Sequence, residues 1–398
     1  MAAPVTLLRT QVGIVGGGPA GLMLGHLLHL HRIDSVILER RPEDHVVERV
    51  RAGVLEQGTV DLLASTGAGD RLQREGMRHG GIYVAFEQAR HRIDMAGLTG
   101  GRVITIYGQN EVVRDLIDAR RASGAPLRFE VSDLTLHDVD SDRPNIRFVE
   151  QGQEFALACD WIAGCDGFHG PCRTAIPAAK LRTFERIYPF AWLGILAEAA
   201  PTSEELVYSL HERGFALFSM RSPAITRLYL QVPPDEDVAA WPDERIWSEL
   251  QIRLRTSDGW RPKEGAIVQK GITGMRSFVA EPMRFGRLFL AGDAAHIVPP
   301  TGAKGLNLAM ADVARLARGF ERFYGDGQTD LLETYSERGL RRVWRAQRFS
   351  WWMTSMLHRI PGDAPFDHRR QIAELDYLVS SSAAMTSLSE NYTGIPFE

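Results

Sequence analysis

The feature that most constrains the fold is a glycine-rich turn between an apolar strand and an apolar helix near the N-terminus. The pattern predicts a buried strand over residues 10–16 (TQVGIVG), a helix over residues 19–31 (PAGLMLGHLLHLH) and a second strand over residues 34–39 (DSVILE). These segments make a βαβ unit. The turn at residues 16–21 (GGGPAG) matches the pattern GxGxxG in the strand-to-helix context that this motif requires. The unit therefore predicts a Rossmann-like, dinucleotide-binding fold.

Each glycine of the motif has a physical role in holding a dinucleotide. Gly16 permits the tight turn, Gly18 lets backbone N–H groups approach a pyrophosphate, and Gly21 lets the helix pack closely on the strand. The N-terminus of the helix then faces an anion, which the helix dipole favours. Glu39 ends the second strand 18 residues after Gly21 and would accept hydrogen bonds from a ribose. A plain glycine turn in a nucleotide-free protein is the competing interpretation, and this context disfavours it.

Two further segments favour FAD over NAD(P) as the bound dinucleotide. Residues 165–167 (CDG) end a predicted strand, and Gly292-Asp293 follows the apolar run LFLA. In a flavoprotein of this layout, Asp293 would reach the ribityl chain. The helix that begins near Gly305 would point its N-terminus at the flavin ring and stabilise negative charge there. Either segment alone would more often be an ordinary turn.

The composition of the 398-residue chain disfavours several classes of protein. Its hydrophobic and charged shares, 44% and 24%, are those of a globular protein with two or three domains, or with one large cofactor-binding domain carrying insertions. The net charge is −4, so we expect neither a nucleic-acid nor a membrane partner. The N-terminus lacks the basic region of a signal peptide. The sequence contains no CxxC pair, so the cysteines do not predict a metal site. Three cysteines without a disulfide framework indicate a cytoplasmic setting.

The remaining pattern predicts an α/β chain with an inserted sheet and a helical C-terminal region. We expect helices over residues 54–66, 110–123, 241–254, most of 305–357 and 367–379, antiparallel strands within 127–165 and 187–234, and an irregular tail ending NYTGIPFE.

We group these elements into domains. An FAD-binding domain of the GR2 type would take residues 8–180 and 275–330. A mainly antiparallel substrate-binding sheet would be inserted at 181–274. A helical region would take residues 331–398, and its aromatic run SWWMTSML would lie either in a core or at a dimerisation interface.

Together these segments resemble one family. The stretches GGGPAG, CDG and GDAAHIVPPTGAKGLNLA are similar to those of the class A flavoprotein aromatic hydroxylases. RAGVLEQGTVDLL, IAGCDGFHG, SFVAEPM, RFSWWMTSMLHR and ENYTGIP resemble the members that act on 4-hydroxybenzoate. The likeness runs from about residue 10 to the C-terminus, almost free of insertions.

The resemblance implies a reaction in two parts. NAD(P)H would reduce FAD when the aromatic substrate is bound. The reduced flavin would capture O2 as a C4a-hydroperoxide, whose distal oxygen goes to the ring carbon beside the phenol. The implied product is 3,4-dihydroxybenzoate.

The resemblance also assigns residues to the substrate carboxylate. Arg221 matches the carboxylate-binding arginine, whose planar guanidinium can bind in two places. Ser219 and Tyr229 match hydroxyls that bind the same carboxylate. Because Ser219 and Arg221 lie two apart, both point to one face of a strand.

The phenol end needs groups that favour the phenolate, since phenol has a pKa near 10. Tyr208 matches the residue that contacts the substrate hydroxyl, Tyr392 its partner, and His79 the end of a proton chain to solvent. Histidine suits that role because it titrates near neutral pH. Pro300 matches a proline whose carbonyl contacts the substrate hydroxyl, and Asn307 a residue near the flavin and the helix start.

The resemblance also implies which residues contact the FAD cofactor. Arg51 would counter the pyrophosphate charge, and Arg227 would face the flavin. The full set of FAD contacts implied beyond the first motif is Arg51, Gln109, Asp166, Arg227, Asp293, Gly305, Leu306 and Asn307.

NAD(P)H has no second GxGxxG motif here, as in the family. The matching positions are Arg40, Arg41, His45, His169, Arg173 and Arg276. NADPH-specific members have glutamine and tyrosine at positions 41 and 45. The cations here could bind a 2′-phosphate, whereas Glu43, Asp44 and Glu48 oppose one, so we expect NADPH and leave NADH open.

Two alternatives stand beside this hypothesis. A sibling hydroxylase would act on another phenol, such as 3-hydroxybenzoate or an aminobenzoate, but we expect it to alter at least one end of the substrate set. A non-catalytic FAD-binding protein would not need polar groups at both ends of a substrate.

Overall fold

The predicted βαβ unit lies at the centre of a six-stranded sheet. The computed structural model describes residues 5–48 and 53–397. In it β2 (Val12–Val15) leads into α1 (Pro19–Leu30), and β3 (Ser35–Leu38) runs parallel to β2. The strand order is β19-β20-β13-β2-β3-β9, which adds β9 (Leu127–Arg128), β13 (Trp161–Gly164), β19 (Arg284–Phe285) and β20 (Leu288–Leu290).

This sheet brings three distant sequence motifs to one edge. Strands β20, β13 and β2 are neighbours and run parallel. Parallel strands have their carboxyl ends at the same edge, where open α/β sheets bind ligands. The glycine turn follows β2, the CDG segment follows β13, and Gly292-Asp293 follows β20. The predicted FAD motifs therefore meet where a dinucleotide would lie.

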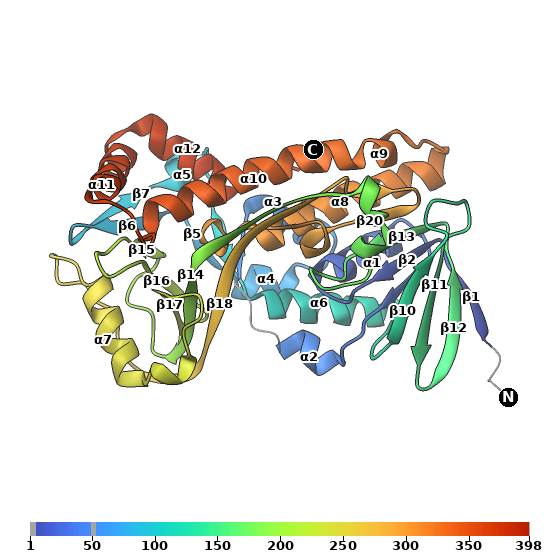
Figure 1. The fold of residues 1–398 in the computed structure, drawn as a ribbon, viewed down its shortest axis with the longest axis horizontal. Helices are drawn as coiled ribbons and strands as arrows, with labels where there is room; N and C mark the ends of the chain where they lie inside the picture. Colours follow the sequence, from blue (N-terminus) through green and yellow to red (C-terminus); the bar gives the residue numbers. More distant parts are fainter. Residues whose placement is uncertain (1–4, 49–52, 398) are drawn as a thin grey trace.

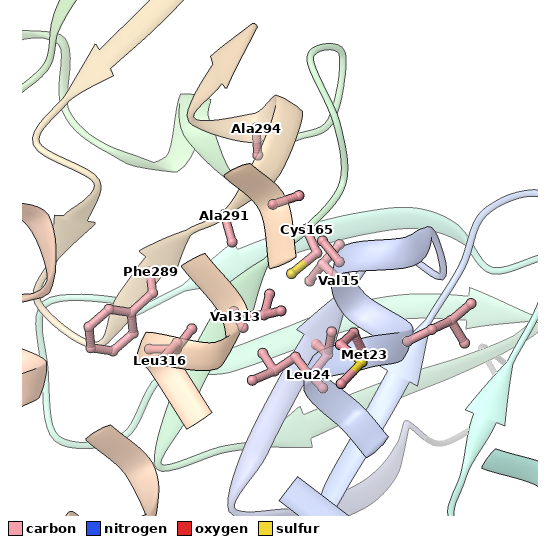
Figure 2. Close-up of a cluster of buried hydrophobic side chains, with 14 of the residues drawn as sticks. Val15, Met23, Leu24, Cys165, Phe289, Ala291, Ala294, Val313 and Leu316 are labelled. Atoms are coloured by element: carbon pink, nitrogen blue, oxygen red, sulfur yellow. The ribbon is translucent and has the colours of Figure 1, made fainter. Parts of the chain in front are cut away.

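Helices α1 and α8 (Gly305–Asp326) pack together over this sheet. In Figure 2, Met23 and Leu24 of α1 approach Val313 and Leu316 of α8. All four side chains are fully buried. Burial of such large apolar side chains stabilises the fold by about 2 kcal/mol each, and it fixes the N-terminus of α8 near the glycine turn.

A second, eight-stranded sheet forms the other half of the molecule (Figure 1). Its order is β21-β18-β14-β17-β16-β15-β6-β7, antiparallel except where β15 pairs with β6. The strands are β6 (Ile82–Phe86), β7 (Ala89–Ile93), β14 (Arg182–Glu198), β15 (Val207–Ser209), β16 (Ala216–Met220), β17 (Thr226–Val232), β18 (Ala266–Glu281) and β21 (His296–Ile297). The long strands β14 and β18 run between the two halves.

The domain limits stay a prediction, and the sheet does not follow them residue by residue. Strands β6 and β7 lie within 8–180 but pair into the eight-stranded sheet, and β18 continues across residue 274. Two smaller sheets complete the fold, with orders β1-β12-β11-β10 and β4-β8-β5. Their strands are β1 (Thr6–Arg9), β4 (Val54–Leu55), β5 (Met77–His79), β8 (Ile104–Ile106), β10 (Ser132–His137), β11 (Asn145–Glu150) and β12 (Gln153–Ala158).

The C-terminal region is helical almost to its end, so the predicted irregular tail is wrong. Helix α12 (Ser382–Thr393) covers most of it. The Ser381 side chain caps this helix by accepting a hydrogen bond from the backbone N–H of Ala384, at 3.3 Å. Leu388 and Tyr392 bury one face. No helix in the described part of the chain is both long and apolar enough to cross a membrane.

The other helices agree with the predicted ranges to within a few residues, and several short ones add to them. They are α2 (Glu43–Glu48), α3 (Gln57–Ser65), α4 (Asp70–Glu75), α5 (Met95–Leu98), α6 (Gln109–Ala122), α7 (Asp243–Leu254), α9 (Asp330–Glu333), α10 (Tyr335–Leu357) and α11 (Pro365–Ser380).

Candidate active site

The glycines of the turn differ in how much space surrounds them: a side chain would clash at Gly16 and Gly21 but not at Gly18. Gly16 has φ +106°, and a Cβ there would lie 2.3 Å from the carbonyl oxygen of Cys165. A Cβ at Gly21 would lie 1.9 Å from the Gly16 carbonyl oxygen. At Gly18, by contrast, a Cβ would meet no atom of the described residues within 4 Å. Gly18 is also the N-cap of α1 and has no side chain to cap it, so the described part of the chain leaves room for a ligand at this helix N-terminus.

Two acids lie beside this turn. Glu39 is nearly buried, and its carboxylate accepts hydrogen bonds from the backbone N–H groups of Gly17 at 2.6 Å and Arg41 at 2.8 Å. Asp166 accepts from the Cys172 N–H at 2.8 Å through Oδ2. Its Oδ1 is buried and has no hydrogen-bond partner among the described residues. Burial raises the pKa of the Asp166 carboxyl.

A buried charge pair fixes the second flavin segment. Asp312 of α8 accepts hydrogen bonds from the Gly292 N–H at 3.0 Å and from Nε2 of His296 at 2.6 Å. The His296 and Asp312 side chains are each 1% exposed. The turn between them leaves Asp293 exposed. At the start of α8, a Cβ on Gly305 would meet no atom within 4 Å in the part of the chain that the structure describes.

Asn307 connects the N-terminus of α8 by hydrogen bonds to β4 and to the start of α3. Its Oδ1 accepts from the Glu56 N–H at 2.9 Å and the Thr59 hydroxyl at 2.8 Å. Its Nδ2 donates to the carbonyls of Val54 at 3.0 Å and Ala303 at 2.8 Å. Both amide atoms are therefore engaged by protein, so Asn307 can act near the flavin by holding the helix rather than by a free polar group.

The predicted substrate residues share one face of the eight-stranded sheet. Residues opposite each other on antiparallel strands point to the same side. Tyr208 is opposite Leu217, and Leu217 is opposite Tyr229. Ser219 lies two residues from Leu217 and is opposite Arg227. Strand register alone thus gathers the two tyrosines, the serine and Arg227.

At one end of this face, Tyr208 and Tyr392 are hydrogen-bonded through their hydroxyls. Both residues are buried, and the Tyr208 hydroxyl also donates to the carbonyl of Thr301 at 3.3 Å. Thr301 follows Pro300 in the same short turn, Pro300–Gly302, so the segment that carries Pro300 lies against Tyr208. Burial raises the pKa of Tyr208 well above its usual range, and that of Tyr392 as well.

His79 lies on β5 in a more apolar setting than its predicted role requires. Its side chain is buried, and Nδ1 has no hydrogen-bond partner among the described residues. Burial lowers the pKa of His79 to about 4. The imidazole therefore stays neutral near pH 7, contrary to the near-neutral titration that suggested its role in proton transfer.

At the other end of the face lie two arginines. Arg221 follows the last residue of β16, and its Nη2 donates to Oδ1 of Asn110. Arg227 donates through Nε to the Tyr229 hydroxyl. Burial lowers the pKa of Arg221, and the nearby charge of Arg227 lowers it further. Ser219 is buried and donates weakly to the Met220 carbonyl, at 3.3 Å.

Comparisons with known proteins agree with this geometry. A family model described as an FAD binding domain matches residues 9–350. The chain is 48% identical over 391 residues to p-hydroxybenzoate hydroxylase of Acinetobacter baylyi, which covers 98% of this chain and 96% of that protein. The chain belongs to the FAD-dependent flavoprotein hydroxylases.

The chain also has a more distant relative in sequence and a similar fold among solved structures. A 3-(3-hydroxy-phenyl)propionate/3-hydroxycinnamic acid hydroxylase of Burkholderia vietnamiensis is 26% identical over 78% of this chain and 56% of its own length. The crystal structure of p-nitrophenol 4-monooxygenase from Pseudomonas putida superposes with a TM-score of 0.82 at 19% identity, over 98% of this chain and 99% of that one.

The residues present fit the FAD of this family. The uncapped α1 N-terminus and the open space at Gly18 would take the pyrophosphate, and Glu39 would take a ribose. Asp166 Oδ1, which is buried and lacks a hydrogen-bond partner among the described residues, could accept a hydrogen bond from the cofactor. Gln109 is the first residue of α6, and Leu306 is half-buried at the start of α8. Arg51, also predicted to contact FAD, lies outside the described residues.

The residues predicted to bind NAD(P)H fall into two groups. The guanidinium groups of Arg173 and Arg276 lie 4.7 and 4.6 Å from the centre of the Phe168 ring, and the exposed His169 ring makes a T-shaped contact with it. Arg173 also donates to the carbonyls of Phe168 and Ala294. Arg40, Arg41 and His45 form the second group, exposed around the start of α2.

Lys304 and Glu56 were not among the site residues predicted from the sequence. Lys304 is buried, and its Nζ donates to Glu56 Oε1 at 2.6 Å and to the backbone carbonyls of Asn391 and Tyr392. It therefore joins the start of α8 to the backbone of the tyrosine pair. The available signal was a lysine as the one charged residue of the glycine-rich segment GAKGLNLA.

Proposed function

We propose that the chain hydroxylates 4-hydroxybenzoate at C3. One atom of O2 enters the ring, the other leaves as water, and NAD(P)H supplies the two electrons. The observation that carries this proposal is the buried Tyr208–Tyr392 hydroxyl pair, which lies on the same sheet face as Ser219 and Tyr229. A para-hydroxylated benzoate has a phenol and a carboxylate at opposite ends, which matches this arrangement.

FAD, when bound, accepts hydride from NAD(P)H and activates O2 for transfer to the ring. The protein's own contribution at the phenol end is to move a proton. Because burial raises the pKa of Tyr208, its hydroxyl stays protonated and can donate to a substrate phenolate. A proton from the substrate can pass to Tyr208 as Tyr208 gives its own to Tyr392, provided that Tyr392 releases its hydroxyl proton to a further acceptor in the same transfer.

Beyond the tyrosines, we propose that His79 exchanges tautomers rather than carrying a stable charge. With its pKa lowered to about 4, a neutral ring would accept a proton on one nitrogen and release one from the other. Nδ1, which is buried without a partner among the described residues, is available for this exchange.

At the carboxylate end, Arg221 provides a half-buried cation that remains charged, since arginine is protonated even when its pKa falls somewhat. The hydroxyls of Ser219 and Tyr229 would add hydrogen bonds on the same side of the sheet. The name of the 48% identical relative, p-hydroxybenzoate hydroxylase, supports the same substrate.

The test is direct. The purified protein should be yellow, with flavin absorbance bands. Addition of 4-hydroxybenzoate should stimulate NADPH oxidation and yield 3,4-dihydroxybenzoate by chromatography. Rapid NADPH oxidation that gives only hydrogen peroxide would exclude this substrate. Turnover of 3-hydroxybenzoate or an aminobenzoate in its place would support a sibling activity.

We further propose a cytoplasmic homodimer. All three cysteines are buried and free, which suits a reducing compartment. Exposed aromatic side chains lie on the C-terminal helices predicted to dimerise, with Trp351 45%, Phe366 74% and Tyr377 58% exposed. Light scattering of the purified holoenzyme should give twice the 44.4 kDa mass of the chain.

A further inference from the structure

The Arg221 side chain contacts the first turn of α6. Its Nη2 donates to Oδ1 of Asn110, the second residue of that helix. Residue 108 also has no room for a side chain, because a Cβ on Gly108 would lie 2.4 Å from the same Nη2. Gly108 therefore leaves the space that the guanidinium fills, and Asn110 supplies an acceptor beside it.

Asn110 is itself held by a network of charges. Its Nδ2 donates to Glu111 Oε1 at 2.9 Å, and Glu111 Oε2 accepts from Arg71 Nη1 at 2.5 Å. Arg71 also donates to Asp115 Oδ1 at 2.8 Å, and Asp115 Oδ2 accepts from the Tyr107 hydroxyl at 2.7 Å. The amide can hardly flip, because a flip would place its NH2 group against the Arg221 cation and its oxygen against a carboxylate.

The chemical identity of residue 110 matters as much as its position. An amide oxygen orients a guanidinium without neutralising it. A carboxylate at the same place would pair with Arg221 and compete with the carboxylate of the substrate. An asparagine therefore fixes the guanidinium and leaves its charge for the ligand. Burial and then the nearby charge of Arg227 lower the pKa of Arg221, so the cation gains from a neutral acceptor that fixes its position.

We propose that Asn110 is a positioning residue, which orients Arg221 to bind the substrate carboxylate. The inference rests on the proposed function, because it assumes that the ligand is a carboxylate held by Arg221. It also links the two halves of the site, since Gln109, a predicted FAD contact, is the preceding residue of the same helical turn. No sequence motif marks this pair, whose members lie 111 residues apart.

The test compares a charged with a neutral ligand. Flavin absorbance of the holoenzyme is titrated with 4-hydroxybenzoate and with 4-hydroxybenzamide, which lacks the negative charge. Asn110→Ala should raise the Kd for 4-hydroxybenzoate about tenfold, the usual cost of a lost hydrogen bond to a charged group. Asn110→Asp should raise it further. The Kd for 4-hydroxybenzamide should stay within about twofold in the alanine variant.

Two controls make the result specific. Asn145→Ala removes an asparagine–carboxylate hydrogen bond in the four-stranded sheet and should change neither Kd. In an Arg221→Gln background, Asn110→Ala should have no further effect, because its role passes through Arg221. Asn110→Ser keeps an acceptor oxygen and replaces the alanine variant if that variant fails to hold FAD.

Three outcomes would overturn the inference. If Asn110→Ala weakens both ligands equally, residue 110 shapes the site rather than orienting Arg221. If the variants bind 4-hydroxybenzoate as the wild type does, the inference fails and the proposed function stands. If the wild-type holoenzyme does not bind 4-hydroxybenzoate at all, the proposed function fails, and the inference fails with it.

Discussion

Tyr208 and Tyr392 show how single residues acquire a role from their surroundings. Neither hydroxyl faces water, and each has the other as a hydrogen-bond partner. A tyrosine on a strand is more often a core residue, and these two lie 184 positions apart. Their pairing therefore has no local sequence signal, and only the family resemblance predicted it.

Removal of the Tyr208 hydroxyl should separate flavin reduction from hydroxylation. In Tyr208→Phe, NADPH should still reduce the flavin in the presence of 4-hydroxybenzoate, since binding of the carboxylate is unchanged. Product formation should fall by at least about tenfold, because the phenolate loses a hydrogen bond to a buried donor. Stopped-flow absorbance and product chromatography measure the two steps. Tyr188→Phe, which removes a hydroxyl bonded to Ser277 in the same sheet, is the control. Hydroxylation near the wild-type level in Tyr208→Phe would contradict the proton-transfer role.

His79 should make the folded protein sensitive to acid. Burial lowers its pKa from the ordinary value near 6.5 to about 4, so the unfolded chain takes up the proton first as pH falls. The loss of unfolding free energy that His79 causes is negligible above pH 6.5 and grows as the pH falls toward 4. At pH 5 it amounts to about 2 kcal/mol. The free energy of unfolding in urea, measured at pH 7.5 and pH 5, should fall by this much more in the wild type than in His79→Gln. Equal losses in both proteins would show that His79 is not the group responsible.

At the scale of elements, the start of α8 is where flavin and substrate segments are joined. Asp312 holds Gly292 and His296 in the segment after β20, and Asn307 holds the strand before α3. The sequence predicted α1 and α8 because apolar periodicity and glycine signals are local. It missed α12, whose serine-rich stretch has weak helix preference. That helix depends on packing of Leu388 and Tyr392, which a local pattern does not reveal.

Asp312→Asn should loosen this junction. The amide can still accept from the Gly292 N–H, but His296 loses the charge that raises its pKa. Breaking a buried pair of this kind costs about 3 kcal/mol or more in unfolding free energy. We expect a lower unfolding midpoint and faster loss of FAD during ultrafiltration. Asp326→Asn, at the exposed C-terminal end of the same helix, should change neither quantity. An unaltered midpoint in Asp312→Asn would remove the pair from this role.

At the scale of the whole molecule, two sheets place the site between them. The parallel strands of the six-stranded sheet align the three FAD motifs, and the register of the eight-stranded sheet aligns Tyr208, Ser219 and Tyr229. The fold class followed from the βαβ unit and the alternating strands, because both patterns are local. The meeting of Arg221 with Asn110 and of Lys304 with Glu56 did not, since each depends on packing between segments far apart in sequence.

Coenzyme preference also concerns the whole molecule, because the residues predicted to bind NAD(P)H come from separate parts of the chain. Arg40 and Arg41 are exposed after β3, far in sequence from Arg173, which lies against the Phe168 ring. If they bind a 2′-phosphate, the double variant Arg40→Ala/Arg41→Ala should raise the KM for NADPH about tenfold, as for a lost charged hydrogen bond. The KM for NADH, which lacks that phosphate, should stay within about twofold. Arg143→Ala, an exposed arginine beside the four-stranded sheet, is the control. An equal rise in KM for both coenzymes would show that the two arginines contact a group common to NADPH and NADH. The preference for NADPH would then have to come from other residues.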